Sequence, residues 1–195
     1  MSSYQLAIAP PNGALGRQGV LDLGVLDHVR MRAWDRLLFV ECADGWLVEE
    51  AWRRLGKGCV CGLSKSPELV DLAVRMRGVP GRVEFKRWDS ERFPLANQSF
   101  DRVISCVPCG RYLEPVAVLR EIARVLRPDG DAYLLESDDA APRVPRALGV
   151  ADLERLLLEA GFGDVQRNGG DAAPTGRGDR AIPVVLHARQ CSPRP

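Results

Sequence analysis

The chain of 195 residues has few lysines, few histidines and no long apolar run. Lysine occurs only at positions 57, 65 and 86, and the formal net charge is +1. So small a net charge argues against the strong field that draws nucleic acids or anionic membranes to a protein. No apolar run approaches the roughly 18–20 residues that span a bilayer. We therefore expect neither a nucleic-acid partner nor a membrane span.

The first residues also lack the pattern of a secretory signal. Residues 1–19 contain no basic n-region and no long apolar h-region. We therefore expect a soluble, cytoplasmic protein whose six cysteines are thiols. The length and the 46% hydrophobic content fit one globular domain. We predict that domain over 26–190, with an arm at 1–25 and a tail at 191–195.

Short apolar runs alternate with amphipathic segments along most of the chain. The predicted strands are 37–42, 58–63, 82–88, 100–107, 131–136, 163–167 and 181–189. Apolar residues at helical spacing predict helices after Asp44, after Ser66, over 114–126 and over 151–162. The second helix has the clearest start, because Ser66 can cap it and Pro67 suits its first turn. Its predicted inner stripe is Leu69, Leu72, Ala73 and Met76. The alternation predicts an α/β fold, a doubly wound and mostly parallel sheet with helices on both faces.

Ligands of such sheets bind beyond the carboxyl ends of the strands, where the strand order reverses. The segments around these ends read LLFVECADGW, CGLSKSPELV, VEFKRWDSERFPLANQSFDRVIS and YLEPVAVLREIARVLRPDGDAYLLE. In order and spacing they resemble the successive motifs of class I S-adenosylmethionine-dependent methyltransferases, most closely the branch that acts on small molecules. The resemblance covers about residues 37–165. It implies a seven-stranded Rossmann-like sheet whose last strand is antiparallel, with S-adenosylmethionine as the cofactor.

The resemblance also implies where that cofactor would lie. The first loop wraps the methionine end, an acid ending the second strand grips the ribose, and an acid after the third strand holds the adenine amine. In this chain Ser64 stands at the ribose position, whereas Asp89 keeps the adenine-side acid. The residues expected around the cofactor are Glu41, Cys42, Ala43, Gly45, Ser64, Lys65, Asp89, Ser90 and Cys106.

Two of the family's loop glycines are replaced here, by Glu41 and Ala43. Glycine serves in such loops for positive φ or for close approach of the backbone to a ligand. Glu41 also brings a negative charge toward the cofactor carboxylate, which is unfavourable. Ser64 cannot offer two charged acceptors, and a hydrogen bond to a charged group is worth about 1.5–3 kcal/mol. Each such loss lowers affinity by roughly tenfold to a hundredfold.

Two functions therefore stay open. The first is a protein with a degraded cofactor site, non-catalytic or weakly active, that serves as an interaction or regulatory partner of another protein or of a second copy of itself. The alternative is an active methyltransferase on a small molecule. In that alternative Glu41 substitutes for the acid that the family has at Phe39, since alternate strand residues point the same way. Lys65 would then steer the cofactor carboxylate or stack beside adenine.

Several other side chains near these strand ends are of types that can carry chemistry. Cys106 and Cys109 form a C-x-x-C that could bind zinc or act in redox together with Cys42 and Cys61. Cysteine is also among the most commonly buried residues, and we expect no metal site. Trp88 is predicted to be core or pocket wall. No residue is a convincing general base, although proximity and orientation alone can carry much of a methyl transfer.

Overall fold

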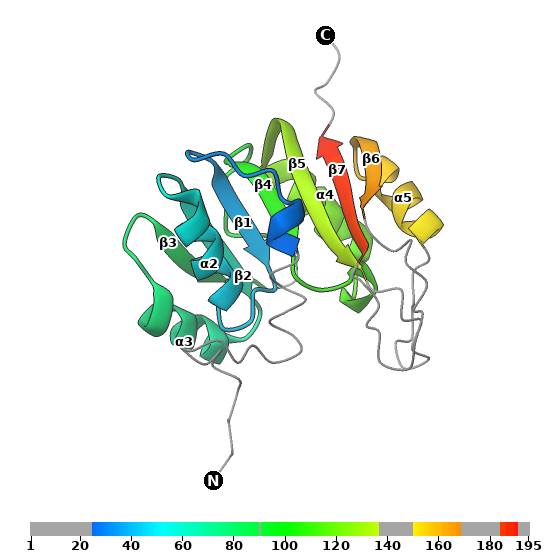
Figure 1. The fold of residues 1–195 in the computed structure, drawn as a ribbon. Coiled ribbons are helices and arrows are strands. Elements are labelled where there is room, and N and C mark those ends of the chain that lie inside the picture. Colours follow the sequence, from blue (N-terminus) through cyan, green and yellow to red (C-terminus); the bar gives the residue numbers. More distant parts are fainter. Residues whose placement is uncertain (1–24, 90, 137–149, 169–183, 191–195) are drawn as a thin grey trace, which may run out of the picture.

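The computed structural model describes residues 25–89, 91–136, 150–168 and 184–190 (Figure 1). A helical turn at 25–28 leads into the sheet. The elements that follow are β1 (Arg36–Val40), α2 (Trp46–Leu55), β2 (Cys59–Ser64), α3 (Pro67–Arg77), β3 (Val83–Arg87), β4 (Phe100–Ser105), the 3-10 turn η1 (Cys109–Arg111), α4 (Pro115–Val125), β5 (Leu126–Glu136), α5 (Val150–Glu159), β6 (Phe162–Asn168) and β7 (Val184–Gln190). Ser90, the tail and all but the last residue of the predicted arm lie outside the described residues.

The strands form one seven-stranded sheet in the order β3-β2-β1-β4-β5-β7-β6. Strands β1 to β5 pair in parallel, and β7 runs antiparallel to both β5 and β6. The predicted α/β fold is confirmed. The chain builds β2 and β3 on one side of β1 and then crosses to β4 on the other, so the strand order reverses between β1 and β4.

Apolar side chains cover both faces of the sheet. On one face, Leu37, Phe39, Ile104 and Tyr133 pack against α2 and the residue 25–29 segment. On the other face, Leu38, Val40, Val103 and Leu134 pack against α4 and α5. Because successive strand residues point to opposite faces, burial on both sides requires the continuous apolar runs seen in the sequence. Within the described residues, no helix is long and apolar enough to cross a membrane.

The helix starts combine one confirmed prediction with one correction. Ser66 caps α3 as predicted, since its hydroxyl accepts a hydrogen bond from the Leu69 amide at 3.2 Å. The cap of α2 is Gly45 rather than Asp44. Asp44 nevertheless serves the helix start, because its carboxylate accepts the amide of Trp46 at 3.2 Å.

Two further predictions need correction. The inner stripe of α3 is narrower than predicted, because only Ala73 is fully buried and Met76 is 57% exposed. Strand β5 begins at Leu126, directly after α4, rather than at residue 131. Leu126 already pairs with Phe100 of β4, which extends the sheet through the segment predicted as a turn.

Candidate functional site

Four side chains meet beyond the carboxyl ends of the first four strands. Glu41 directly follows β1, Lys65 follows β2, and Trp88 follows β3. Tyr112 comes from the loop after β4, and its hydroxyl lies 2.8 Å from that of Ser105, the last residue of β4. We name Glu41, Lys65, Trp88 and Tyr112 the strand-end cluster. It occupies the switch point between β1 and β4, which is where sheets of this topology bind their ligands.

The strand-end cluster is held by direct contacts among its members. The indole N–H of Trp88 donates to Glu41 Oε1 at 2.9 Å. The ammonium of Lys65 lies 4.0 Å from the same oxygen, 4.6 Å from the ring centroid of Trp88 and 5.6 Å from that of Tyr112. Cations so placed over aromatic rings are attracted by the ring quadrupole. The four side chains therefore interlock across the ends of the strands.

The members of the cluster differ in their access to solvent. Both aromatic residues are buried, with 3% of Trp88 and 4% of Tyr112 exposed. The side chains of Lys65 and Glu41 are 36% and 20% exposed. Burial raises the pKa of Glu41, and the charge of Lys65 together with the Trp88 hydrogen bond offsets only part of that rise. The carboxylate is thus stabilised by the same two residues that cover it.

The loop after β1 keeps a backbone conformation typical of glycine although two of its residues are not glycine. Glu41, Ala43 and Gly45 have φ angles of 59°, 50° and 78°. A non-glycine residue in this left-handed region costs roughly 1–2 kcal/mol. Gly45 is required for space as well, because a Cβ there would lie 2.4 Å from Cε1 of Phe85. The fold around the loop thus imposes this backbone shape despite the side chains.

Arg77, at the end of α3, is the residue that fastens this loop. Its guanidinium donates to the Asp44 carbonyl at 3.0 Å and to the Asp44 carboxylate at 3.1 Å. It also donates to Glu49 at 2.5 Å, and only 11% of its side chain is exposed. The sequence prediction missed this contact, and its sole signal was a basic residue in the last turn of a helix.

The residues at the predicted ribose and adenine positions flank the strand-end cluster. Ser64 is 2% exposed, and its hydroxyl accepts the amide of Ser66 at 3.3 Å, within the turn that leads into α3. Asp89 is exposed, and its Oδ1 accepts the amides of Glu91 and Arg92 at 3.0 and 3.3 Å. These backbone hydrogen bonds lower the pKa of Asp89. Both side chains therefore already accept hydrogen bonds from backbone amides of the adjacent turns.

The cysteines act as packing residues in this part of the fold. Cys42, Cys61 and Cys109 are buried, and Cys106 is half-buried. Burial raises the pKa of Cys61 to about 12 and that of Cys42 further still. Cys42 packs on β2, since a Cβ at Gly62 would lie 2.7 Å from its sulfur. Among the described residues, no group of three or more His, Cys, Asp or Glu side chains is placed to hold a metal ion.

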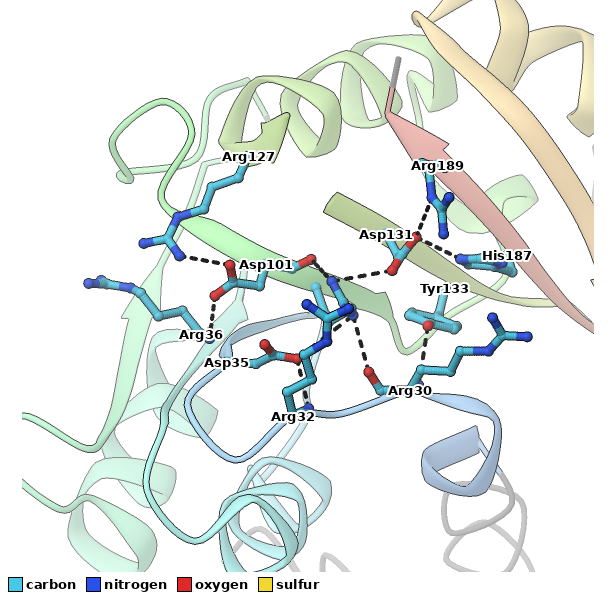
Figure 2. Close-up of polar contacts among 11 residues, drawn as sticks. Arg30, Arg32, Asp35, Arg36, Asp101, Arg127, Asp131, Tyr133, His187 and Arg189 are labelled. Carbon is cyan, nitrogen blue, oxygen red and sulfur yellow. Dashed lines mark hydrogen bonds and ion pairs between the residues drawn. The ribbon is translucent and has the colours of Figure 1, made fainter. Parts of the chain in front are cut away.

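A second polar cluster lies near the opposite, amino ends of the strands (Figure 2). Its centre is Asp131 of β5, which accepts hydrogen bonds from His187 at 2.9 Å and Arg189 at 3.3 Å, both on β7. Arg102 of β4 lies 3.2 Å from Asp131 and 3.8 Å from Asp35. We name Asp35, Arg102, Asp131, His187 and Arg189 the amino-end network. The sequence prediction did not find it, although charged residues inside the apolar strands β4 and β5 were a signal.

Two surface hollows lie away from the strand-end cluster. One, of about 300 Å³, is lined by residues from the starts of β1 and β2 and from the segment 94–100. The other, of about 380 Å³, lies between the end of α3 and β3. Neither hollow is lined by a member of the strand-end cluster.

Comparisons with known proteins agree with this fold. A family model described as a methyltransferase domain matches residues 38–130. Among curated proteins, the phthiotriol/phenolphthiotriol dimycocerosates methyltransferase of Mycobacterium leprae is 36% identical over 95 residues. That alignment covers 49% of this chain but only 35% of the relative, so the chain spans about a third of that protein's length.

Solved structures show the same fold. A SAM-dependent methyltransferase from Aquifex aeolicus superposes with a TM-score of 0.68 at 20% identity, covering 86% of this chain and 88% of the other. A chain from the complex of the Haloferax volcanii Trm112 methyltransferase activator with a methyltransferase partner gives a TM-score of 0.69 at 18% identity, covering 87% and 88%. At these identities the likeness concerns the fold.

Proposed function

Because the chain belongs to the class I S-adenosylmethionine-dependent methyltransferase superfamily, we propose that it is a methyltransferase-fold protein whose cofactor site is closed by its own side chains. It is non-catalytic or weakly active and acts through contact with another protein. The observation that carries this proposal is the strand-end cluster. Trp88, Glu41 and Lys65 contact one another, and Lys65 and Trp88 directly follow and precede Ser64 and Asp89, the positions that the resemblance gives to the ribose and the adenine.

The residues present do not fit an adenosyl sulfonium compound in this arrangement. Ser64 offers one hydroxyl, already used in a turn, where the superfamily uses a carboxylate. The ammonium of Lys65 faces the same space, and it repels a cationic cofactor. For the ligand to enter, Trp88 must release Glu41, and that hydrogen bond to a charged group is worth about 1.5–3 kcal/mol.

The loss of the Lys65 contact with the rings adds about 0.5–2 kcal/mol. The two costs together reach roughly 2–5 kcal/mol, and the missing ribose carboxylate at Ser64 adds about 1.5–3 kcal/mol, so affinity falls by at least several hundred-fold. Arg77 meanwhile holds the loop in shape through Asp44 and Glu49. The scaffold is therefore stable while the site stays closed, as an interaction partner requires.

A protein partner fits this function better than a substrate does. The Haloferax structure that shares the fold contains a methyltransferase activator bound to its partner. By analogy, we infer that the present chain binds either another protein or a second copy of itself.

One observation favours the alternative, an active methyltransferase on a small molecule. The loop residues 41, 43 and 45 all keep the left-handed backbone of a glycine loop, and Asp89 is exposed at the adenine side. In this alternative Lys65 swings away, and the carboxylate of Glu41 takes over the ribose hydroxyls. The Mycobacterium leprae relative is named as a phthiotriol/phenolphthiotriol dimycocerosates methyltransferase.

Calorimetry with S-adenosylhomocysteine separates the two functions. The closed site predicts no measurable heat for the wild-type chain at millimolar ligand. The double variant Glu41→Gly, Ser64→Asp should gain micromolar binding, because it removes the acceptor that holds Trp88 and restores the ribose carboxylate. The matched control Glu91→Gly, Ser66→Asp makes the same exchanges nearby and should stay silent. Micromolar binding by the wild-type chain would overturn the closed site and favour the alternative, and a silent double variant with an intact thermal transition would show that the site is misplaced.

A further inference from the structure

We propose that Glu41, Trp88 and Tyr112 form a box for an organic cation, and that Lys65 is its built-in occupant. This inference rests on the proposed closed site and adds the class of ligand that could open it. Aromatic rings placed around a quaternary ammonium group are a recurring way in which proteins bind organic cations, and a nearby carboxylate adds an opposite charge. The Lys65 ammonium already lies in that position, within 4.0 Å of Glu41 Oε1 and 4.6 Å of the Trp88 centroid.

The walls of the box are fixed by contacts that do not involve Lys65. The Trp88 amide donates to the Ser64 carbonyl at 3.2 Å, and its ring packs edge-on against Phe93 at 5.0 Å between centroids. The Tyr112 ring is tied to β4 through the Ser105 hydroxyl, which in turn donates to the Val107 carbonyl at 2.9 Å. The box should therefore keep its shape when the lysine leaves.

Lys65 itself is the movable part. Its side chain is 36% exposed, whereas the rings it covers are almost fully buried. A lysine side chain is a flexible four-carbon stem with a hydrated head, so it can turn outward into water. A small cation without a large planar group, such as a quaternary ammonium ion, could then take its place beside Glu41. Ligand and lysine cannot occupy the box together, because two like charges at that spacing repel.

The chain contains an internal comparison for this contact. The Lys57 ammonium lies 5.0 Å from the ring centroid of Trp34, but that indole is 70% exposed. None of the described contacts of Lys57 involves a carboxylate. In its described contacts, Lys57 thus has one exposed aromatic ring, but no carboxylate and no second ring as Lys65 has. The third lysine, Lys86, lies 3.6 Å from Glu84.

Because the chain has only three lysines, labelling lysine with carbon-13 at the ε position gives three side-chain signals. Arginine substitutions at each lysine assign them. We expect the Lys65 ε-protons to be shifted strongly upfield by the two buried rings, and to lose that shift in Trp88→Leu. Added tetramethylammonium, compared with sodium at equal ionic strength, should return the Lys65 signal toward its free position and leave Lys86 unmoved. A Lys65 signal at the free position in the wild-type chain would overturn the proposal.

Substitution of the occupant gives a second, independent readout. Lys65→Met should tighten tetramethylammonium binding at least tenfold, whereas Lys57→Met should leave it unchanged. Equal affinities for the wild-type chain and Lys65→Met would also overturn the box. The outcome is distinguishable from that of the proposed function, because tetramethylammonium has no adenosyl group and tests only the cation site, whereas S-adenosylhomocysteine tests adenosyl binding.

Discussion

At the scale of single residues, the loop after β1 shows a conflict between backbone and side chain. Ala43 has a φ of 50°, a left-handed conformation that costs free energy for an L-residue. The contacts around the loop impose this conformation. Arg77 supplies some of those contacts through its hydrogen bonds to Asp44. The strain lies where the superfamily's cofactor loop lies, and the stability it costs should be measurable.

Ala43→Gly should therefore not destabilise the protein. Relief of the left-handed strain is worth roughly 1–2 kcal/mol, and the added freedom of the unfolded chain offsets about 0.4–1 kcal/mol of it. We expect the free energy of unfolding in urea to rise by about 0.5 kcal/mol on balance. The control is Ala117→Gly on the exposed side of α4, which should lower it by about 1 kcal/mol. Equal losses at both positions would show that the loop is not strained.

The residues of the candidate site could be foreseen only in part. The exchanges at Glu41, Ala43 and Ser64 can be predicted from the sequence, because the family resemblance implies a definite role for each of these positions. The bond from Trp88 to Glu41 is not visible, because the two residues are 47 positions apart and an indole has many possible partners. Trp88 was predicted to be core or pocket wall, and the structure confirms the burial.

At the scale of elements, periodicity predicts strands and helices well where both faces of a strand are buried. Every predicted strand and helix has a counterpart in the structure. The start of β5 was wrong, because Pro128 and Gly130 suggest a turn while the pairing of Leu126 with Phe100 keeps the segment in the sheet. The predicted burial of Met76 was also wrong, for a related reason. It lies at helical spacing from Ala73, but no described element covers that side of α3.

The amino-end network should make its strands sensitive to acid. Burial alone would raise the pKa of Asp131, but the hydrogen bond from His187 and the charge of Arg102 outweigh it and hold that pKa below its ordinary value. A carboxyl with a lowered pKa stabilises the fold above its unfolded-state pKa, and this contribution is lost as the pH falls through the folded-state pKa. Arg189 and Asp35 face the same cluster.

Asp131→Asn tests this directly. It removes the charge that pairs with Arg102, and breaking a buried pair costs about 3–5 kcal/mol. We expect the free energy of unfolding at pH 7 to fall by about 3 kcal/mol, and the gap to the wild-type chain to close on acidification as Asp131 is protonated. Asp164→Asn, at an exposed position on β6, should change it by less than about 0.5 kcal/mol. A gap that stays constant down to strong acid would contradict the assigned charge state.

At the scale of the whole molecule, different side-chain contacts hold the two ends of the sheet. At the amino ends of the parallel strands, hydrogen bonds and ion pairs to the buried Asp131 link β4, β5 and β7. At the carboxyl ends, one side chain from each of the first four strands or their loops fills the switch point. The overall topology follows from the sequence pattern and the family resemblance. What fills the switch point depends on side-chain contacts between segments distant in sequence, which no local pattern records.

The most direct test of the closed site is a crystal structure of the wild-type chain grown with millimolar S-adenosylhomocysteine. The account predicts that the indole of Trp88 still donates to Glu41, with Lys65 over its ring and no adenosyl group between Ser64 and Asp89. Density for an adenosyl group at that place, with Trp88 turned away from Glu41, would contradict it.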